Sequence, residues 1–198
     1  LPNRVLPMLP EELSNGICSL VEGQDRLAMS VLVDIDRAGK VHAVSFKETV
    51  IRSDARLTYD EVQEFADGGR MPMGRRKLEK DLKVLLDITG LLRRQRFADG
   101  ALDFDLPEAR VLVGEDGELE VQPIRSNQAR QLIEELMLLA NRLVAAELSR
   151  RTIPALYRVH EDPSEDRLEA LTRGVARLGY TLDHENVTQA DLQRLLGE

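Results

Sequence analysis

The sequence predicts an α+β fold, in which hairpins of antiparallel sheet are mixed with, and pack against, several α-helices. Three observations favour this class: short apolar runs occur in pairs around turns, capped leucine-rich helical segments separate the pairs, and no βαβ alternation is present. The chain has 198 residues, 42% of them hydrophobic and 31% charged. It can therefore bury a core as one sizeable domain, or as two small ones.

The predicted strands are short and bounded by turns. Two β-branched apolar runs predict a hairpin over residues 27–51, in which Gly39 can take the positive φ of a tight turn. The same pattern predicts a second hairpin over residues 109–124. Alternating apolar residues predict a strand at residues 101–107, and a further strand is predicted at residues 153–160.

The two long helices lie in the middle of the chain. Leucines at near-helical intervals predict one over residues 75–97, and a run rich in Leu, Ala, Glu and Arg predicts another over residues 127–151, before Pro154. A shorter helix is expected to begin at Thr58 and Glu61, which have the spacing of a capping box.

Two more helices are predicted near the C-terminus. Asp162 is the expected N-cap of the first, with Pro163 at its first helical position and Glu165 completing the box. Thr188 and Asp191 repeat this capping pattern for a final short helix.

Charge is unevenly distributed along the chain. The net charge of −8 and pI near 5.1 argue against binding nucleic acid over the whole surface. Residues 70–96, however, contain nine basic against three acidic residues. This segment is a candidate phosphate-facing helix, although a solvated helix face is the more common meaning of such a run.

Cysteine usage and hydropathy indicate the compartment. Cys18 is the only cysteine, so an internal disulfide and a Cys₂ or Cys₄ zinc site are excluded within one chain. Apolar runs are broken well short of the roughly 20 residues of a membrane span. No cationic-then-apolar signal peptide opens the chain. We expect a cytoplasmic protein that does not contact membranes.

Motifs of catalysis are lacking. His42, His160 and His184 have no metal-ligand spacing with one another or with Cys18, and there is no glycine-rich phosphate loop or serine nucleophile elbow. The carboxylates form no short-range cluster of the kind that holds two metal ions. On motifs, the chain by itself contains no catalytic residue and no metal ligand.

One helix carries polar residues beside an apolar face. Glu134 and Asn141 are seven residues apart and return to nearly the same azimuth, since a helix has about 3.6 residues per turn. Arg130, one turn before Glu134, can pair with it. The alternative is a polar helix edge that carries an ordinary Arg–Glu pair.

Other candidates also have structural alternatives. Arg158 and His160 alternate onto one face of the strand predicted at residues 153–160, where a hydrogen-bonded structural pair is the alternative. Tyr59 lies in the first turn of its helix and Phe104 alternates with leucines. Core packing is the default interpretation for both aromatic residues.

Five blocks of the sequence, in order and spacing, resemble the catalytic (RNB) domain of the ribonuclease II / ribonuclease R family. The resemblance extends from Leu1 to about Tyr180 and is carried by RVLPMLPEELSNGICSL at 4–20, ETVIRSDARLTYDEV at 48–62, ALDFDLPEARV at 101–111, NQARQLIEELMLLAN at 127–141 and IPALYRVHEDPSEDRLEAL at 153–171.

The resemblance implies a hydrolytic, processive 3′-to-5′ exoribonuclease that uses Mg²⁺ to degrade single-stranded RNA to nucleoside 5′-monophosphates. The family's metal-binding aspartate cluster and its phosphate-contacting arginine segment are not found in residues 1–198. We therefore expect an interior, central part of the catalytic domain that is inactive by itself. Its expected partners are single-stranded RNA and flanking small β-barrel RNA-binding domains of the same parent protein.

The resemblance also implies residue roles. Phe104 matches the aromatic that clamps the terminal bases by stacking, which tolerates any base sequence. Tyr59 and Glu134 match the pair that contacts the sugar of the 3′-terminal nucleotides, and a carboxylate that accepts a hydrogen bond from a 2′-hydroxyl favours RNA over DNA. The resemblance gives supporting roles to Asn141, Arg158 and His160. Two other hypotheses stay open: an inactive RNA-binding or scaffold derivative of the fold, and an acidic α+β interaction module.

Overall fold

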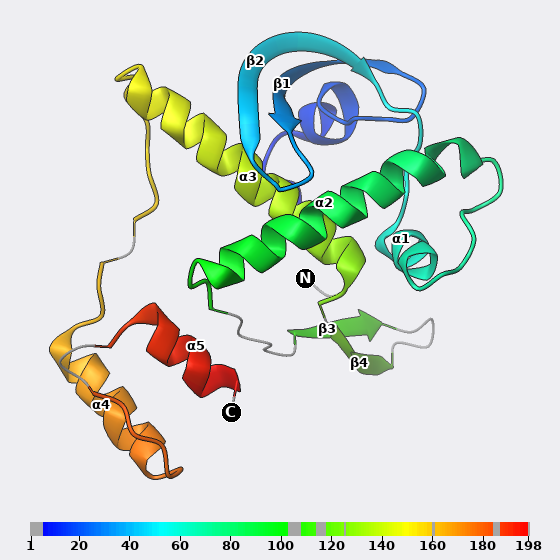
Figure 1. Cartoon of the computed structure of the whole chain (residues 1–198). Coiled ribbons are helices and arrows are strands. Elements are labelled where there is room, and N and C mark those ends of the chain that lie inside the picture. The colour runs from blue at the N-terminus through cyan, green and yellow to red at the C-terminus, as the bar shows by residue number, and fades with distance from the viewer. Residues whose placement is uncertain are drawn as a thin grey trace. The chain divides into compact units, whose positions relative to one another are not determined.

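The computed structural model describes residues 6–102, 108–113, 118–124, 126–159, 161–183 and 187–197. The chain divides into two compact units (Figure 1). The first unit comprises Leu1–Leu92 and Leu106–Ala145, and the second comprises Arg93–Asp105 and Ala146–Glu198. The observed elements confirm the α+β class, because antiparallel hairpins and helices alternate without a parallel strand pair in either described sheet.

The first hairpin is formed by β1 (Asp25–Ile35) and β2 (Val41–Arg52), as the apolar runs predicted. Gly39 takes a φ of 78° in the turn. One carboxylate oxygen of Asp36 accepts hydrogen bonds from the backbone N–H groups of Ala38 and Lys40, at 2.8 and 3.0 Å. This side chain therefore closes the turn together with the glycine.

The second hairpin is also confirmed. β3 (Glu108–Val113) pairs antiparallel with β4 (Leu119–Ile124), in a separate two-stranded sheet. Most of the strand predicted at residues 101–107 lies outside the described residues, and its first two residues are not in a strand.

The chain enters α1 (Tyr59–Ala66) through the predicted capping box. The Thr58 hydroxyl accepts from the Glu61 backbone N–H at 3.3 Å, and the Glu61 carboxylate accepts from the Thr58 backbone N–H at 2.7 Å. The Thr58 backbone N–H and, at 3.0 Å, the Thr58 hydroxyl both donate to the Glu61 carboxylate, and they hold the pKa of Glu61 below its ordinary value. The helix ends before Gly68, whose φ of 91° suits a residue without a β-carbon.

The two long helices lie close to their predicted ranges. A single 3₁₀ turn, η2 (Arg76–Leu78), leads into α2 (Glu79–Ala98), and α3 spans Gln128–Arg150. The sequence did not predict the π-helical segment η1 (Glu12–Ile17) near the start of the chain. No described helix is long and apolar enough to span a membrane.

The core of the first unit lies where α1, α2 and α3 meet. It is centred on three buried side chains: Met71 from the segment after α1, Leu82 from α2 and Leu132 from α3. Partly buried side chains surround this centre: Leu57, Val62, Phe65, Leu78, Leu86 and Leu136. Because the three helices contribute to one cluster, burial of these leucines fixes the helices relative to one another within the unit.

The second unit contains α4 (Glu165–Ala176) and α5 (Gln189–Gly197), with buried Val175 and Leu182. The capping pair of α5 is confirmed: the Thr188 backbone N–H donates to Asp191 at 3.1 Å, and the Asp191 backbone N–H donates to the Thr188 hydroxyl at 3.2 Å.

Two predictions for the second unit were wrong. The residue before α4 is Ser164, with extended backbone and no side-chain capping bond, so Asp162 is not the N-cap and Pro163 lies outside the helix. Residues 153–159 are not in a strand, since no described strand pairs with them. A strand-like sequence requires a neighbouring strand to satisfy its backbone groups.

Leu132→Ala should destabilise the first unit by about 2–5 kcal/mol, because it leaves a cavity at the helix junction. The exposed Met137 of the same helix provides the control, and Met137→Ala should cost far less. Urea unfolding followed by helical circular dichroism measures both. Equal losses would show that Leu132 is not central to the core.

The contacts of Glu147 make the free energy of unfolding depend on pH in the acid range. Glu147 accepts hydrogen bonds from Arg150 and Arg151, and these arginines lower its pKa to about 2 from an ordinary 4.5. Because the folded-state pKa is the lower one, the stabilisation is present above pH 4.5 and is lost as pH falls from there towards 2.

Thermal melts of the original chain and of Glu147→Gln test this expectation. Near neutral pH the original chain should melt at a higher temperature than the Glu147→Gln variant. The two melting temperatures should converge as the pH falls towards the folded-state pKa of Glu147. A difference that stays constant over the acid range would contradict it.

Candidate nucleic-acid interface

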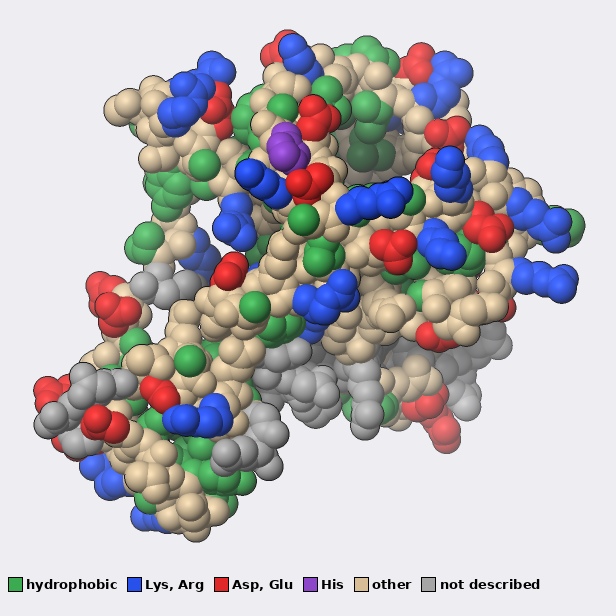
Figure 2. All heavy atoms as spheres, in the orientation of Figure 1, with side chains coloured by type: hydrophobic (Ala, Val, Ile, Leu, Met, Phe, Trp, Pro, Cys, Tyr) green, Lys and Arg blue, Asp and Glu red, His purple; other side chains and the backbone are tan. Residues whose placement is uncertain are grey.

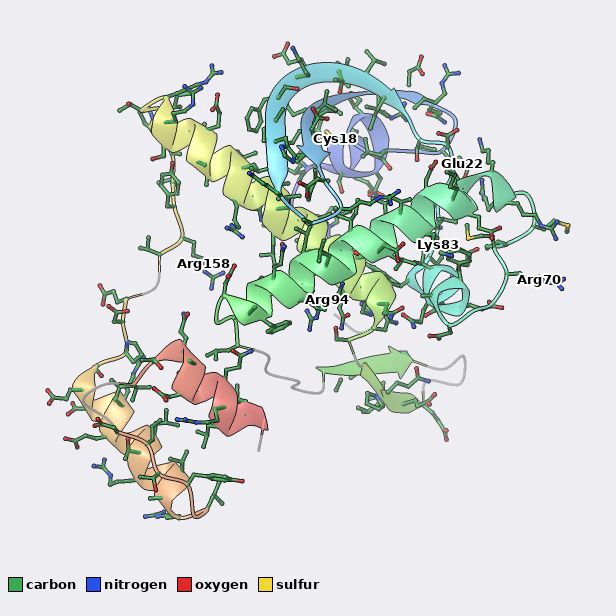
Figure 3. All side chains as sticks on the ribbon, viewed as in Figure 1. Cys18, Glu22, Arg70, Lys83, Arg94 and Arg158 are labelled. Carbon is green, nitrogen blue, oxygen red and sulfur yellow. The ribbon has the colours of Figure 1, made fainter. Side chains whose placement is uncertain are left out.

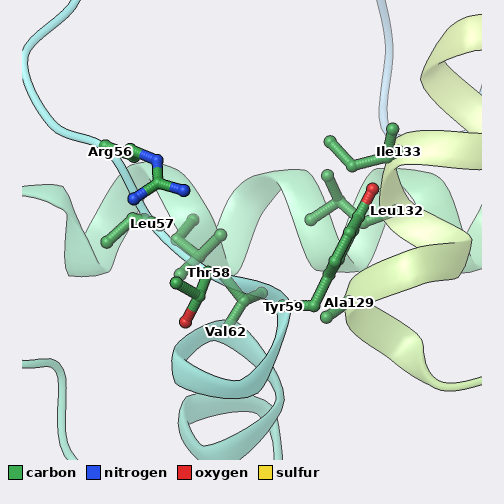
Figure 4. A pocket seen from close by; sticks show the side chains of 9 residues that line it. Arg56, Leu57, Thr58, Tyr59, Val62, Ala129, Leu132 and Ile133 are labelled. Carbon is green, nitrogen blue, oxygen red and sulfur yellow. The ribbon is translucent and has the colours of Figure 1, made fainter. Parts of the chain in front are cut away.

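A pocket of about 500 Å³ opens beside the helix junction of the first unit. Its walls come from the segment that leads into α1, from α1 itself, from α2 and from α3. The lining residues are Arg56, Leu57, Thr58, Tyr59, Val62, Leu82, Ala129, Leu132 and Ile133 (Figure 4). Most of this lining is apolar, with Arg56, Thr58 and Tyr59 providing polar groups.

Tyr59 is the aromatic residue among the residues that line the pocket. The capping box places it at the first position of α1, and its side chain stands beside Ala129, Leu132 and Ile133 of α3 (Figure 4). The residue is 43% exposed, so it is not the core residue that the default interpretation of an aromatic side chain favoured. One partner is Arg130, whose guanidinium carbon lies 4.7 Å from the centre of the ring. A flat aromatic surface therefore borders the pocket and is accessible to solvent.

Two side-chain hydrogen bonds stabilise the beginning of α3, and one of them joins it to α1. The side-chain amide oxygen of Asn127 accepts from the Arg130 backbone N–H at 3.0 Å. Gln63, from α1, accepts from the Ala129 backbone N–H at 3.2 Å. Both bonds satisfy N–H groups that a helix start leaves without an intrahelical partner. The second also links the two helices directly beside Tyr59.

Glu134 lies one helical turn after Arg130 and is exposed, as its predicted place on a polar edge requires. Asn141 is exposed as well. Arg130 itself stacks on Tyr59. The structure thus brings Tyr59 beside the residues of α3 that directly precede Glu134, so the two predicted sugar-contacting residues belong to one region of the first unit.

Sequence reasoning missed two residues of this region. Glu135 is only 3% exposed although it is charged. Its position three residues after Leu132 places it on the core-facing side of α3, which was the available signal. Arg56 was also missed, because nothing in its local sequence shows that it lines a pocket.

An ion pair fixes the segment that carries Arg56. Both carboxylate oxygens of Glu22 accept hydrogen bonds from Arg75, at 2.6 and 2.7 Å, and one of them also accepts from the Arg56 backbone N–H at 2.9 Å. The Arg75 guanidinium is the main reason that the pKa of Glu22 lies below its ordinary value. This contact ties the entrance of α1 to the segment before α2.

The predicted basic segment is partly occupied by structural contacts. Arg75 pairs with Glu22, and Lys77 pairs with Asp54 at 2.9 Å. Lys83 and Arg94 are exposed on α2 (Figure 3). Acidic side chains are interspersed with the basic ones on the visible surface (Figure 2). These observations agree with a solvated helix face and do not separate out a dedicated phosphate-binding stripe.

The remaining candidate residues do not line the pocket in the part of the chain that the structure describes. Phe104 and His160 lie outside the described residues. Arg158 is exposed in the second unit, in the segment that is not a strand (Figure 3). The roles of these three residues, and of Asn141, therefore stay predictions.

A metal site is not formed by the described part of the chain. Within it, no group of three or more His, Cys, Asp and Glu residues could hold a metal ion. Mg²⁺ binds through carboxylates and other oxygen ligands in octahedral geometry. The described residues thus do not fit the magnesium ion that the resemblance implies.

Known proteins resemble this chain over nearly its full length. Ribonuclease R from Aquifex aeolicus is 41% identical over 183 residues, which cover 90% of this chain and 26% of that protein. Ribonuclease R from Thermotoga maritima is 39% identical over 202 residues, covering 99% of this chain and 28% of the relative. The chain thus spans little more than a quarter of the length of these curated relatives.

A solved structure agrees with the sequence matches. RNase R from Mycoplasma genitalium, in complex with double-stranded RNA, superposes with a TM-score of 0.89 at 29% identity, covering 96% of this chain and 34% of that one. Residues 1–197 match the RNB domain family. The fold, the sequence blocks and the match across almost every residue lead to one conclusion: this chain belongs to the RNB domain family of ribonucleases.

Proposed function

We propose that this chain is the central, RNA-channel part of a metal-dependent exoribonuclease that degrades single-stranded RNA processively from the 3′ end. Hydrolysis would release nucleoside 5′-monophosphates. The observation that carries the proposal is the similarity to ribonuclease R along at least 90% of the chain in the relatives described above. A second structure of the Mycoplasma genitalium enzyme, bound to ribose-methylated single-stranded RNA, superposes with a TM-score of 0.88 and supports RNA as the ligand.

In this proposal, the 3′-terminal sugars bind at the pocket and at the adjoining face of α3 that carries Glu134. Tyr59 offers an exposed ring and Glu134 an exposed carboxylate, on two helices that the core packs together. The carboxylate of Glu134 accepts a hydrogen bond from a ribose 2′-hydroxyl, which DNA lacks. Phe104 stacks on the terminal bases, with Asn141, Arg158 and His160 in supporting roles.

The chemistry of the reaction is assigned to other residues of the parent protein. A bound divalent metal, proposed to be Mg²⁺, would activate water and stabilise the leaving oxygen. The described residues do not provide its ligands. We propose that these ligands, and the arginine that contacts the scissile phosphate, belong to polypeptide beyond this chain, together with flanking β-barrel domains that bind RNA.

An acidic protein can still bind RNA if positive potential is concentrated at the mouth of its channel. The net charge of −8 is therefore compatible with the proposal. A cytoplasmic location is part of the proposal and is supported by the single cysteine.

The complete parent protein should hydrolyse single-stranded RNA in the presence of Mg²⁺, whereas this chain by itself should not. The physical reason is that hydrolysis requires the metal to activate the attacking water, and the described residues of this chain do not provide the ligands of that metal. A 5′-labelled RNA, followed by gel electrophoresis, separates stepwise shortening from the 3′ end from internal cleavage.

A reaction with chelator provides the baseline for both proteins. Turnover by this chain above that baseline would contradict the proposal that its catalytic groups lie elsewhere. RNA binding without turnover by the complete protein would instead favour the inactive, RNA-holding derivative. Absence of RNA binding by the complete protein would favour an interaction module.

Glu134→Ala, made in the complete protein, should reduce kcat/KM for RNA more than for DNA of the same sequence. The expected loss is roughly tenfold, the worth of one hydrogen bond to a charged group. Glu134→Gln retains an oxygen acceptor and should keep part of the preference.

Glu79→Ala is the matched control, since Glu79 is an exposed carboxylate at the start of α2 and does not line the pocket. An RNA-to-DNA ratio that is the same in the Glu134→Ala variant and the unaltered protein would remove the 2′-hydroxyl role.

A further inference from the structure

We infer that Arg130 is a positioning residue of the RNA site: its guanidinium holds the Tyr59 ring on the side of α3 that carries Glu134. The inference rests on the proposed function, and it adds a residue to which neither the sequence pattern nor the family resemblance gave a role in RNA binding.

The first support is the stacking geometry. The guanidinium carbon of Arg130 lies 4.7 Å from the centre of the Tyr59 ring, within the range at which a cation is attracted to an aromatic face. Arginine keeps its charge throughout the pH range in which proteins are folded, and its planar group can lie flat on a ring. The contact therefore restrains the ring at any working pH.

The second support is that the backbone of both partners is anchored. Tyr59 lies within the capping box of α1, between Thr58 and Glu61. The Arg130 backbone N–H donates to Asn127, and the preceding N–H, of Ala129, donates to Gln63 of α1. The beginning of α3 is thus joined to α1 by a hydrogen bond next to the stack. A stack between anchored backbones loses less conformational freedom than one between mobile segments.

The third support is the placement of Glu134. Residues four apart on a helix lie on the same face, so Arg130 and Glu134 are neighbours along α3. A ring restrained by Arg130 is consequently kept beside this face. Because Tyr59 is 43% exposed, a freely rotating ring could otherwise turn towards solvent and away from Glu134.

The fourth support is what the pocket provides without Arg130. The side chains of α3 that line it next to Tyr59 are those of Ala129, Leu132 and Ile133, and all three are apolar. They can contact the ring but offer it no directional interaction. Among the described contacts of the Tyr59 ring, the cation–π contact with Arg130 is the one that selects an orientation.

A double-mutant cycle in the complete protein tests the inference. Arg130→Ala should reduce kcat/KM for single-stranded RNA by roughly threefold to thirtyfold, the range expected for a cation–π contact. It should also reduce the ratio of kcat/KM for RNA to kcat/KM for DNA of the same sequence. Combined with Tyr59→Ala, it should cause no further loss, because a positioning residue acts only through the ring.

Two more variants separate charge from shape. Arg130→Gln removes the charge and should resemble Arg130→Ala. Arg130→Lys keeps the charge without the planar group and should retain part of the preference for RNA. Arg142→Ala is the control for removing an exposed arginine from α3, because Arg142 does not line the pocket. Arg142→Ala should leave the ratio of kcat/KM for RNA to kcat/KM for DNA unchanged.

Other results would overturn the inference. Equal losses on RNA and DNA that add to those of Tyr59→Ala, with a weaker salt dependence of binding, would mean that Arg130 binds phosphate directly. A large fall in melting temperature, with equal loss on both substrates, would mean that it acts on folding. Unchanged kinetics would mean that it has no role. RNA affinity measured in chelator provides a readout that does not require turnover.

The proposed function fails in a different way. If the complete, unaltered protein neither binds nor degrades RNA, the function itself is wrong. If the unaltered protein is active and the cycle is additive, only the role of Arg130 is wrong.

Discussion

The packing of Leu82 and Leu132 against Met71 is the constraint on which the first unit depends. The helix α1 has only eight residues, fewer than an isolated helix needs to be stable in water. It persists because Val62 and Phe65 pack against the cluster formed by the long helices. The position of Tyr59, at the start of this short helix, is therefore a consequence of core packing between segments that are distant in sequence.

The candidate interface uses the beginnings of helices. Tyr59 starts α1 and Arg130 lies in the first turn of α3, where backbone N–H groups have no intrahelical carbonyl to donate to and need side-chain acceptors. Glu61, Asn127 and Gln63 supply such partners. The hydrogen bonds that stabilise the beginnings of these helices also bring the aromatic ring and the guanidinium together, so local folding and site geometry have the same cause.

The first hairpin exposes apolar side chains on one of its faces. On one face of the first hairpin, Leu27 is 80% exposed and Val50, its partner in register, is 64% exposed. Such an apolar face is more often covered by protein than by water.

Local patterns were reliable where neighbours in sequence provide the interactions. The capping box at Thr58, the turn at Gly39 and the ranges of the two long helices depend on residues a few positions apart, and the structure confirms them. The strand expected at residues 153–160 was wrong over its described part, because a strand needs a partner that the local sequence does not reveal. The cap at Asp162 was wrong because the helix begins only after Ser164, whose backbone is extended.

The sequence by itself determined the fold class, the principal helices and hairpins, and, through five blocks in order and spacing, the resemblance to the family. Only the tertiary structure decided that Tyr59 is half exposed beside a pocket, that Arg130 stacks on it, and that Glu135 is buried while Glu134 faces solvent. The reason is physical: burial and stacking depend on which helix faces meet, and those faces are brought together by contacts between residues far apart in the chain.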